Sequence, residues 1–443
     1  MSFINTFQSW WRGFFPVKDI QSALDVKPAV SAELMRLTEL WYRCYIGQAD
    51  WCGEDFQTGS IVTSLYLEQS VCRELANIVT NEMSVTVSDS HLMLSMQDVL
   101  AELPSELQKG LATGAMVIKP CGADGGVQFI PQSEFIPIEY DSRRRLRKVI
   151  FPEVRKIGEY WYTRLEYHAI EGGTLTITNT AYRSGQRDIL GVPIALADVP
   201  QWADIAPKVS YPTDHPVFGY YRNPLPNTID ASPAGISVFD TALSTICSAD
   251  RQFSRLDYEF DSARRRIIAD EQGVQRVSGR TAIGGDVFTP VDIENLFEDF
   301  TPDIRQADFI AGLNEYKREI EFQCGLSYGD ISDPQSIDKT ATEVRAARQR
   351  KYNTVTAIQR SLKKCIEELV WALAFWNASA TSGYTVTVAF KDSILTDEQT
   401  ERTQDMQDLS LGIMRPEEYR AKWYGEDIDT ARNNLPQTAQ VIE

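Results

Sequence analysis

A run of about 35 residues without glycine or proline constrains the fold of this chain more than any other segment. It extends over residues 340–376, and Thr340 or Thr342 is suited to cap its amino-terminal end. At about 1.5 Å per residue, a helix of this length measures on the order of 50 Å. Its apolar side chains recur largely at steps of three and four, which predicts one buried face: Val344, Val355, Ile358, Leu362, Ile366, Leu369 and Leu373.

The segment that precedes this helix, residues 325–339, has the composition of a loop. Two glycines, one proline and several serines and aspartates interrupt any helix or strand pattern. We expect the loop to be flexible and polar, with its aspartates in solvent. Asp330, Asp333 and Asp338 could also be imagined as acid/base or metal-binding groups. Their spacing does not match Asp-x-Asp-x-Asp-Gly, so the solvated loop is the favoured interpretation.

Two further helices, with a β-rich segment between them, are predicted upstream of the loop. Residues 236–263 and 303–324 combine apolar residues at helical spacing with many charges. The intervening residues, 264–302, are rich in turns and short strands. This order of helix, strands and helix is typical of a stalk that carries a small tip.

The amino-terminal half of the chain mixes helices and strands. Residues 60–83 carry apolar residues close to helical spacing, which predicts an amphipathic helix. Apolar and polar residues alternate in later segments separated by glycine-rich turns, which predicts antiparallel hairpins over residues 116–119, 127–130, 160–167 and 175–180. The predicted fold class is therefore α+β.

The formal net charge of −18 limits the partners that the chain can hold tightly. Affinity for DNA comes mainly from neutralised phosphates, so static binding of DNA over the whole surface is not expected. Mild repulsion would suit a passage through which DNA slides, although an acidic surface also simply promotes solubility. No apolar run is long enough to span a membrane. Trp10, Trp11, Phe14 and Phe15 are interpreted as packing groups of a short helix rather than as a membrane-surface anchor.

Sequence motifs of enzymes are missing. There is no GxxxxGKS or GxxxxGKT phosphate loop, no GxSxG and no HExxH. Seven scattered cysteines without CxxC spacing indicate free thiols in a reducing compartment and no zinc site. The three histidines, His91, His168 and His215, lie far apart in the sequence. We therefore expect no catalytic residues, no metal and no cofactor, and a chain that is not an enzyme.

Two clusters of arginine stand out in this acidic chain, at residues 143–145 and 264–266. Such clusters usually lie in solvent or contact acidic groups of a neighbouring subunit, and the second interpretation is attractive in a chain with so many acids. Contact with nucleic acid is the alternative. Neither cluster has the interleaved aromatic residues of a platform for single strands.

Several short motifs occur in an order and spacing that resemble one known family. GAMVIKP at 114–120 and EFIPIEYD at 134–141 are followed by FGYYRNP at 218–224, SPAGISVF at 232–239 and ADRQ at 249–252. GLSYG at 325–329, KTATEV at 339–344 and FKDSI at 390–394, with Asp397 after it, complete the set. Most of the chain thereby resembles the portal proteins of tailed bacteriophages, in the branch common among siphophages and prophages of Gram-positive hosts. Ala234 departs from the family, in which a bulkier residue is more usual.

The resemblance implies a phage portal fold with named parts. Residues 1–235 would form the amino-terminal part of a mixed α/β wing, and residues 236–263 and 303–324 the helices of a stem. A small β-rich clip would occupy residues 264–302, and a tunnel loop residues 325–339. The remaining parts would be a long wing helix with a closing strand at 340–392 and a crown or carboxy-terminal region at 393–443.

The resemblance also implies roles for particular residues. Tunnel-loop residues would face a DNA channel: Ser327, Tyr328, Asp330, Ser332, Asp333, Gln335, Ser336, Asp338 and Lys339. Clip residues would dock partner proteins: Arg264, Arg265, Arg266, Arg276, Arg280 and Asp286. Five arginines are candidates for contacts between subunits: Arg143, Arg144, Arg145, Arg345 and Arg348.

The implied function is that of a head–tail connector, a ring usually of twelve copies at one capsid vertex through which double-stranded DNA is packaged and ejected. Its partners would be further copies of the chain, the terminase large subunit, the major capsid and scaffolding proteins, and a head-completion or adaptor protein, with no membrane. It would assemble in the host cytoplasm and reside in the virion. Two alternatives stay open: a hydrolase that uses the acids of residues 330–338, and another capsid-associated structural protein present in many copies per particle.

Overall fold

The computed structural model describes residues 17–54, 61–81, 83–121, 126–262, 266–269, 276–277, 280–281, 297–300, 305–334, 341–377, 383–390 and 398–435. The chain divides into two units, Met1–Val388 and Ala389–Glu443, and each is treated by itself below. Helices and strands are both abundant, which is compatible with the predicted α+β class. The aromatic residues at positions 10–15 lie outside the described residues.

The larger sheet of the first unit is antiparallel. Its spatial order is β10-β9-β8-β7-β6, with β11 also paired to β9. The predicted strands at 160–167 and 175–180 are confirmed, and a tight turn through Gly172 and Gly173, both with positive φ, joins them. The strands are β6 (Ile136–Tyr140), β7 (Leu146–Ile157), β8 (Tyr160–Glu171), β9 (Thr174–Ser184), β10 (Val192–Ile194) and β11 (Lys208–Tyr211).

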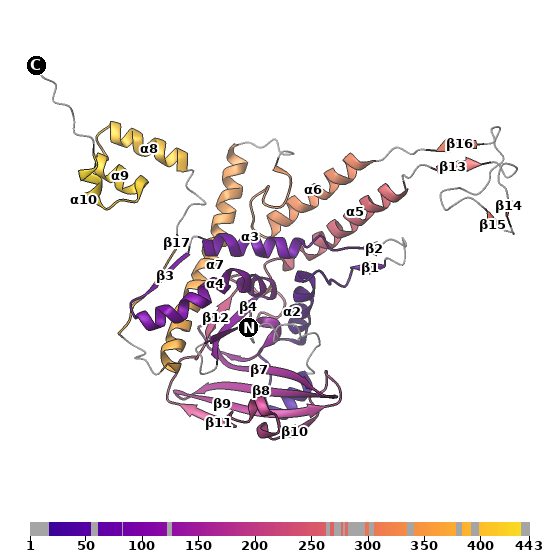
Figure 1. Ribbon diagram of the computed structural model, residues 1–443, viewed down its shortest axis with the longest axis vertical. Coiled ribbons are helices and arrows are strands. Elements are labelled where there is room, and N and C mark those ends of the chain that lie inside the picture. Colours follow the sequence, from indigo (N-terminus) through magenta and orange to yellow (C-terminus); the bar gives the residue numbers. More distant parts are fainter. Residues whose placement is uncertain are drawn as a thin grey trace, which may run out of the picture. The chain divides into compact units, whose positions relative to one another are not determined.

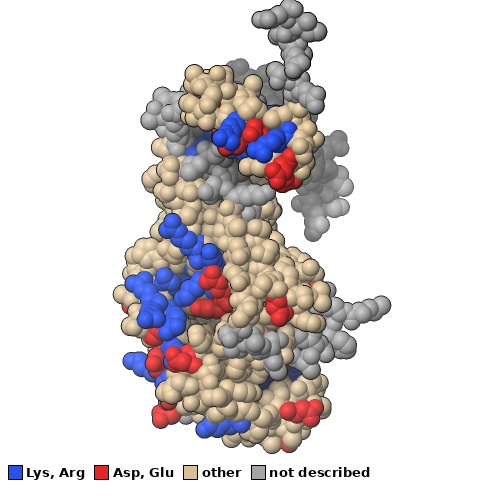
Figure 2. Space-filling model, turned by 90° about the vertical axis from the view of Figure 1, so that its left-hand side faces the viewer, with Lys and Arg blue, Asp and Glu red and all other residues tan. Residues whose placement is uncertain are grey.

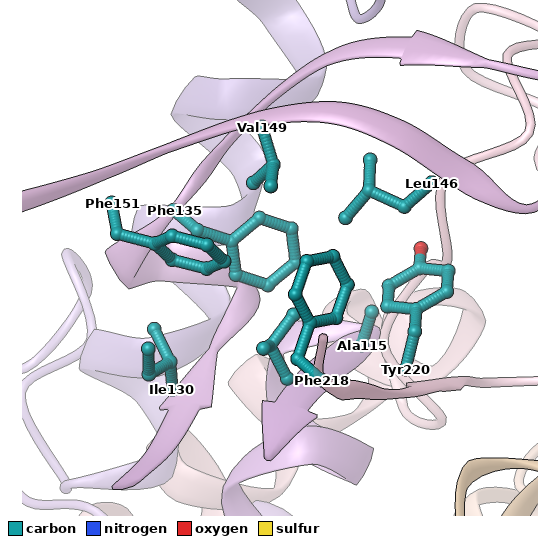
Figure 3. Close-up of a cluster of buried hydrophobic side chains, with 9 residues drawn as sticks. Ala115, Ile130, Phe135, Leu146, Val149, Phe151, Phe218 and Tyr220 are labelled. Carbon is teal, nitrogen blue, oxygen red and sulfur yellow. The ribbon is translucent and has the colours of Figure 1, made fainter. Parts of the chain in front are cut away.

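The smaller sheet is β12-β4-β5, formed by β4 (Ala115–Cys121), β5 (Gly126–Pro131) and β12 (Gly219–Arg222). The predicted strands at 116–119 and 127–130 are therefore confirmed. A cluster of nine buried residues from both sheets fills the space between them (Figure 3). Within it the Phe151 and Phe218 rings meet edge to face at 5.7 Å between centroids. Burying one such side chain stabilises the fold by about 1.5–3 kcal/mol, so this cluster holds the two sheets together.

Helices surround the smaller sheet, as Figure 1 shows for α2 (Ala32–Tyr45), α3 (Leu67–Asn81), α4 (Ser90–Thr113) and α7 (Ala341–Trp376). Gly219 lets α7 lie directly on β12, because a Cβ at this position would come within 2.5 Å of the Cys365 carbonyl oxygen. The amphipathic helix predicted at 60–83 begins later than expected, at Leu67. Ile61 and Val62 instead form strand β2, which pairs with β1 (Gly53–Glu54).

The long helix is confirmed as α7, 36 residues from Ala341 to Trp376. Its predicted apolar face is buried: the side chains of Val355, Ile358, Leu362, Ile366, Leu369 and Leu373 are each at most 1% exposed. The helix therefore gains its stability from packing along one stripe, as its periodicity indicates. The side chain of Val344 lies outside the described part of the helix.

Two antiparallel helices form an arm that carries short strands, as predicted (Figure 1). Thr245, near the start of α5 (Leu243–Ser262), bonds to Gln323 at the end of α6 (Gln306–Gln323), and Glu259 pairs with Arg305 at the far end. The chain between them contains β13 (Arg266–Ala269) paired with β16 (Phe297–Phe300), and β14 (Arg276–Val277) paired with β15 (Arg280–Thr281).

The first helix of the arm does not begin at residue 236, as the sequence suggested, but at Leu243. The Val238 N–H donates to the Leu111 carbonyl, and Asn223 donates to the Ile236 carbonyl. These bonds to other elements hold the backbone before Leu243 out of the helical pattern.

Two glycines meet where α4 ends. Gly114 has φ of +101°, and a Cβ on Gly235 would lie 1.9 Å from its carbonyl oxygen. The buried Asn223 donates its backbone N–H to the same carbonyl and its side-chain amide to Leu111. Neither glycine can carry a side chain without separating these backbones.

The described residues of the second unit form three short helices, α8 (Glu398–Ser410), α9 (Pro416–Tyr424) and α10 (Ile428–Asn433). Asp405 of α8 accepts a hydrogen bond from the Trp423 indole at 2.9 Å and pairs with Lys422 at 2.6 Å. The unit begins at Ala389. In the first unit, strand β17 (Val386–Phe390) pairs with β3 (Met83–Val87), and helix α1 (Val17–Leu24) is the first described element.

All seven cysteines carry free thiols. Cys121 is exposed, Cys52 and Cys247 are half-buried, and the others are buried. In the part of the chain that the structure describes, no helix is both long enough and apolar enough to cross a membrane.

Candidate functional site

The loop predicted at 325–339 begins where α6 ends against α7. Gly325 has φ of +73°, and a Cβ there would lie 2.3 Å from the Thr354 hydroxyl oxygen of α7. Glycine is therefore required both by the backbone conformation and by the closeness of the two helices. The structure describes residues 326–334 of the loop and not residues 335–340.

Glu321, in the last turn of α6, organises the described part of the loop. Its Oε1 accepts the backbone N–H groups of Gly329 at 3.0 Å, Ile331 at 2.7 Å and Ser332 at 2.8 Å. Its Oε2 accepts the Ser332 hydroxyl at 2.8 Å. The side chain is fully buried. Hydrogen bonds to a carboxylate are among the strongest in proteins, so the loop is wrapped around one fixed anchor.

A second anchor joins the loop to two helices through Lys351 of α7. The Lys351 ammonium lies 3.0 Å from the Asp330 carboxylate and 3.2 Å from that of Glu74 in α3. Asp330 also accepts the backbone N–H of Ser327 at 2.8 Å. The Asp330 side chain is 15% exposed, so it is largely shielded from solvent rather than free in it.

Arg350, the neighbour of Lys351, holds the beginning of the loop. Its guanidinium lies over the Phe322 ring at 4.7 Å and the Tyr328 ring at 5.2 Å from the centroids, and it donates to the Leu326 carbonyl at 3.3 Å. Such cation–π contacts each contribute about 0.5–1 kcal/mol at partly exposed sites. Arg350 therefore connects α6, the loop and α7 with one side chain.

The expectation of a flexible, fully solvated loop is wrong for residues 326–334. Ser332 is buried against Glu321, and Ser327, Tyr328 and Asp330 are half-buried. Asp333 is exposed, while its backbone N–H donates to Asn314 of α6 at 2.7 Å. The other channel candidates, Gln335, Ser336, Asp338 and Lys339, lie outside the described residues.

The arginines at 143–145 occupy the turn between β6 and β7. Asp141 accepts the backbone N–H groups of Arg143 at 2.8 Å and Arg145 at 2.9 Å, which fixes the turn. Burial acts to raise the pKa of Asp141, but these N–H groups and the Arg145 guanidinium outweigh it and lower that pKa. Arg143 and Arg144 are exposed, and Arg144 has φ of +60°. The turn thus presents cations outward from a rigid base.

One of these arginines, Arg145, acts on an acidic residue in the second half of α7. Burial raises the pKa of the Glu368 carboxyl, while Lys364, the Tyr220 N–H and Arg145 act in the opposite direction. Arg145 and Lys364 therefore both act on the same carboxyl group, and Lys364 pairs with it at 3.7 Å. Figure 2 shows Lys and Arg side chains gathered in a band on one face of the first unit.

Not all of the predicted intersubunit arginines belong to this neighbourhood. Arg348 is exposed on α7 but lies sixteen residues before Lys364, roughly 24 Å along the helix axis. The side chain of Arg345 is outside the described part. Of the clip candidates, Arg266, Arg276 and Arg280 lie in β13, β14 and β15, and Arg264, Arg265 and Asp286 fall outside the described residues.

A buried ionic network between the two sheets was not predicted. Lys119 of β4 lies 2.8 Å from Glu166 of β8, which also contacts His168 at 2.7 Å and Arg164 at 3.1 Å. Burial acts to raise the pKa of Glu166, but Lys119, His168 and Arg164 hold it well below its usual range. Residues 164, 166 and 168 alternate along β8 and so lie on one face of the strand. This spacing is the sequence signal that could have predicted the network.

Glu321 was also missed, because it lies eight to eleven residues before the backbone groups that it binds, and no local pattern connects them. Among the described residues, no group of three or more His, Cys, Asp or Glu is arranged to hold a metal ion. No protein-family model matches this sequence, and no curated protein matches it either.

Proposed function

We propose that this chain is a ring-forming portal protein, which provides a passage for double-stranded DNA at one vertex of a bacteriophage capsid. The observation that carries the proposal is the order of the arm, the loop and the long helix. Helices α5 and α6 enclose a set of short strands, and α6 runs directly into a loop mounted on the 36-residue α7. The motif resemblance of the sequence points to the same arrangement of stem, clip, tunnel loop and wing helix.

The proposed role of the loop is to line the passage without binding DNA tightly. Its described residues expose one acid, Asp333, and are fixed to both α6 and α7. Each copy carries a formal charge of −18, so a ring would repel the phosphates of DNA over much of its surface. Non-specific affinity for DNA rises with the number of phosphates neutralised, and a sliding contact requires that number to stay low.

The proposal assigns partners to separate parts of the chain. Copies of the chain would contact one another, with the arginines at 143–145 meeting acids of a neighbour. The strands at the tip of the arm would dock the terminase large subunit during packaging and a head-completion or adaptor protein afterwards. Major capsid and scaffolding proteins would surround the ring. The function is not enzymatic, and the protein would assemble in the host cytoplasm and remain in the virion.

Electron microscopy of the purified full chain tests the proposal directly. We expect closed rings with a central hole wide enough for a duplex, and a matching oligomer mass in solution. A chain that stays monomeric in both measurements at high concentration, with and without capsid proteins from the same particle, contradicts it. Antibody labelling of intact particles separates a portal, found at one vertex, from a capsid-associated protein present in many copies.

A further inference from the structure

Two buried carboxyl groups, Glu68 and Asp250, lie at a junction of three parts of the first unit: Leu65, three residues before Glu68, donates its backbone N–H to Asp250. Glu68 is in the first turn of α3, and Asp250 is in α5, the first helix of the arm. Both side chains are 0% exposed. The residues beside strands β1 and β2 complete the junction. A buried carboxyl group is costly unless it is bonded or protonated, so each requires an explanation.

Asp250 is bonded to residues beside β1 and β2. Its Oδ2 accepts the Trp51 indole N–H at 2.8 Å, and its Oδ1 accepts the backbone N–H of Leu65 at 2.9 Å. One turn further along α5, the Ser254 hydroxyl accepts the backbone N–H of Thr63 at 3.2 Å. These three bonds fasten Trp51, Thr63 and Leu65 to the base of the arm.

Glu68 has no such bonds. Neither of its carboxyl oxygens accepts a hydrogen bond from the described residues. Burial raises the pKa of Glu68 to about 8, its own backbone N–H opposes this, and the nearby Asp250 adds to the rise. The Glu68 side chain is therefore mainly protonated at neutral pH. Burial raises the pKa of Asp250 as well, while the Trp51 indole N–H and the Leu65 N–H act to lower it.

The other titratable groups around Glu68 are thiols. They come from α2 (Cys44), from the residue before β1 (Cys52), from α3 itself (Cys72) and from the end of α6 (Cys324). Burial raises the pKa of all four, so they are neutral. Among the described residues of α4 and α7, which also pack on α3, no charged group acts on the Glu68 pKa. Asp250 is thus the one other carboxyl group that acts on the Glu68 pKa among the described residues.

We propose that Glu68 and Asp250 form a proton-dependent clasp: while Glu68 keeps its proton, Asp250 holds Trp51 and Leu65 on α5, and loss of that proton releases them. Among the described residues, no cation acts on the Glu68 pKa and no donor bonds its carboxyl oxygens, so nothing would offset the repulsion between an ionised Glu68 and Asp250. Two like charges in a buried site repel strongly, and the repulsion falls when the junction opens and water enters. The base of the arm is therefore held more loosely at alkaline pH. This inference does not depend on the proposed function.

Hydrogen exchange of the full chain, followed by mass spectrometry between pH 6 and pH 8, tests the clasp. Protection of peptides covering residues 61–66 and 243–256, corrected for the intrinsic rate at each pH, should fall by roughly tenfold or more in the wild type. Glu68→Gln, which keeps the shape and cannot ionise, should show the same protection at both pH values. Glu102→Gln, an exposed glutamate of α4, should behave as the wild type.

Equal protection at both pH values in the wild type, or an unchanged pH response in Glu68→Gln, overturns the proposal. Infrared spectroscopy gives a second readout. The wild type should show the carbonyl stretch of a buried protonated carboxyl group, which weakens as the pH rises past the clasp's transition and is weaker at pH 6 in Glu68→Gln. Glu134, whose pKa burial raises to about 7, contributes equally to both spectra. A wild-type spectrum without that band at pH 6 also contradicts the clasp.

Discussion

Glu321 and Glu68 are both fully buried glutamates at the ends of helices, yet their surroundings are opposite. Glu321 accepts four hydrogen bonds from three residues of the loop that follows α6. Glu68 accepts none from the described residues and lies near a second acid. The first carboxylate fixes a loop by gathering donors, whereas the second is tolerated only because it holds a proton. Burial alone therefore does not show the role of an acidic residue. The hydrogen-bond donors around its carboxyl group distinguish the two cases.

The largest effect in this comparison is expected from Glu321→Ala. The substitution leaves three backbone N–H groups and one hydroxyl without their acceptor, and we expect the free energy of unfolding to fall by about 3 kcal/mol. Urea denaturation measures it. Glu319→Ala, an exposed position on the same helix, is the matched control and should change stability by less than about 0.5 kcal/mol. Similar losses in the two variants would show that Glu321 is not an anchor.

Glu68→Gln should have the next largest effect on the free energy of unfolding, and it should stabilise the protein at alkaline pH instead of destabilising it. The folded-state pKa of Glu68, about 8, lies above its ordinary value of 4.5. A raised carboxyl pKa contributes stability in full below the ordinary value, and this stability is lost as the pH rises towards the folded pKa. The glutamine variant has no proton to lose, so its advantage over the wild type should grow by about 2 kcal/mol between pH 6 and pH 8. Urea denaturation at several pH values checks it, and a constant difference would contradict it.

Ser332→Ala removes one of the four donors of Glu321 and leaves the other three. We expect a loss of about 1 kcal/mol, because the hydroxyl also accepts the Gly329 N–H at 3.1 Å. Ser88→Ala, whose hydroxyl accepts the Thr385 N–H at 2.9 Å in a more exposed place, provides a comparison and should cost less. A loss as large as that of Glu321→Ala would mean that the hydroxyl, and not the backbone, dominates the anchor.

The smallest effect is expected from Lys351→Met, which removes the cation between Asp330 and Glu74. We expect a loss of about 0.5 kcal/mol, since Glu74 is partly exposed to water and Asp330 keeps its hydrogen bond from the Ser327 N–H. The loss should shrink at high salt, because added ions screen the repulsion between the two acids. Lys363→Met, on an exposed part of the same helix, should be neutral at any salt concentration. A salt-independent loss would point to packing instead of charge.

Much of the fold follows from periodicity, and the exceptions have physical causes. The apolar residues of α7 that recur every three or four positions are buried as predicted. They form one stripe along the helix, which is removed from water only when that side packs against the rest of the protein. Helix α4 was not predicted, and Pro104 in its interior obscures its pattern. Residues 236–242 have helical spacing, but bonds to Leu111 and Asn223 outweigh it.

The sequence predicts where the loop of the candidate site lies, but not that other elements hold it in a fixed conformation. Its glycines, serines and aspartates correctly indicate that helix α6 ends and a loop begins. Whether such a loop is loose or fixed depends on side chains from other elements, here Glu321, Arg350 and Lys351. Contacts of this kind join residues that no sequence window contains together, so composition suggested flexibility where the structure has an anchored turn.

The unequal exposure of the seven thiols offers a practical means of counting copies. Cys121, at the end of β4, is the exposed cysteine, while burial raises the pKa of the half-buried Cys52 and Cys247 and slows their reaction. Burial also raises the pKa of Cys121, so labelling with a maleimide dye calls for mildly alkaline buffer. With one fluorophore on each chain, the number of photobleaching steps of a single assembly equals its number of subunits. No engineered cysteine is needed for this measurement.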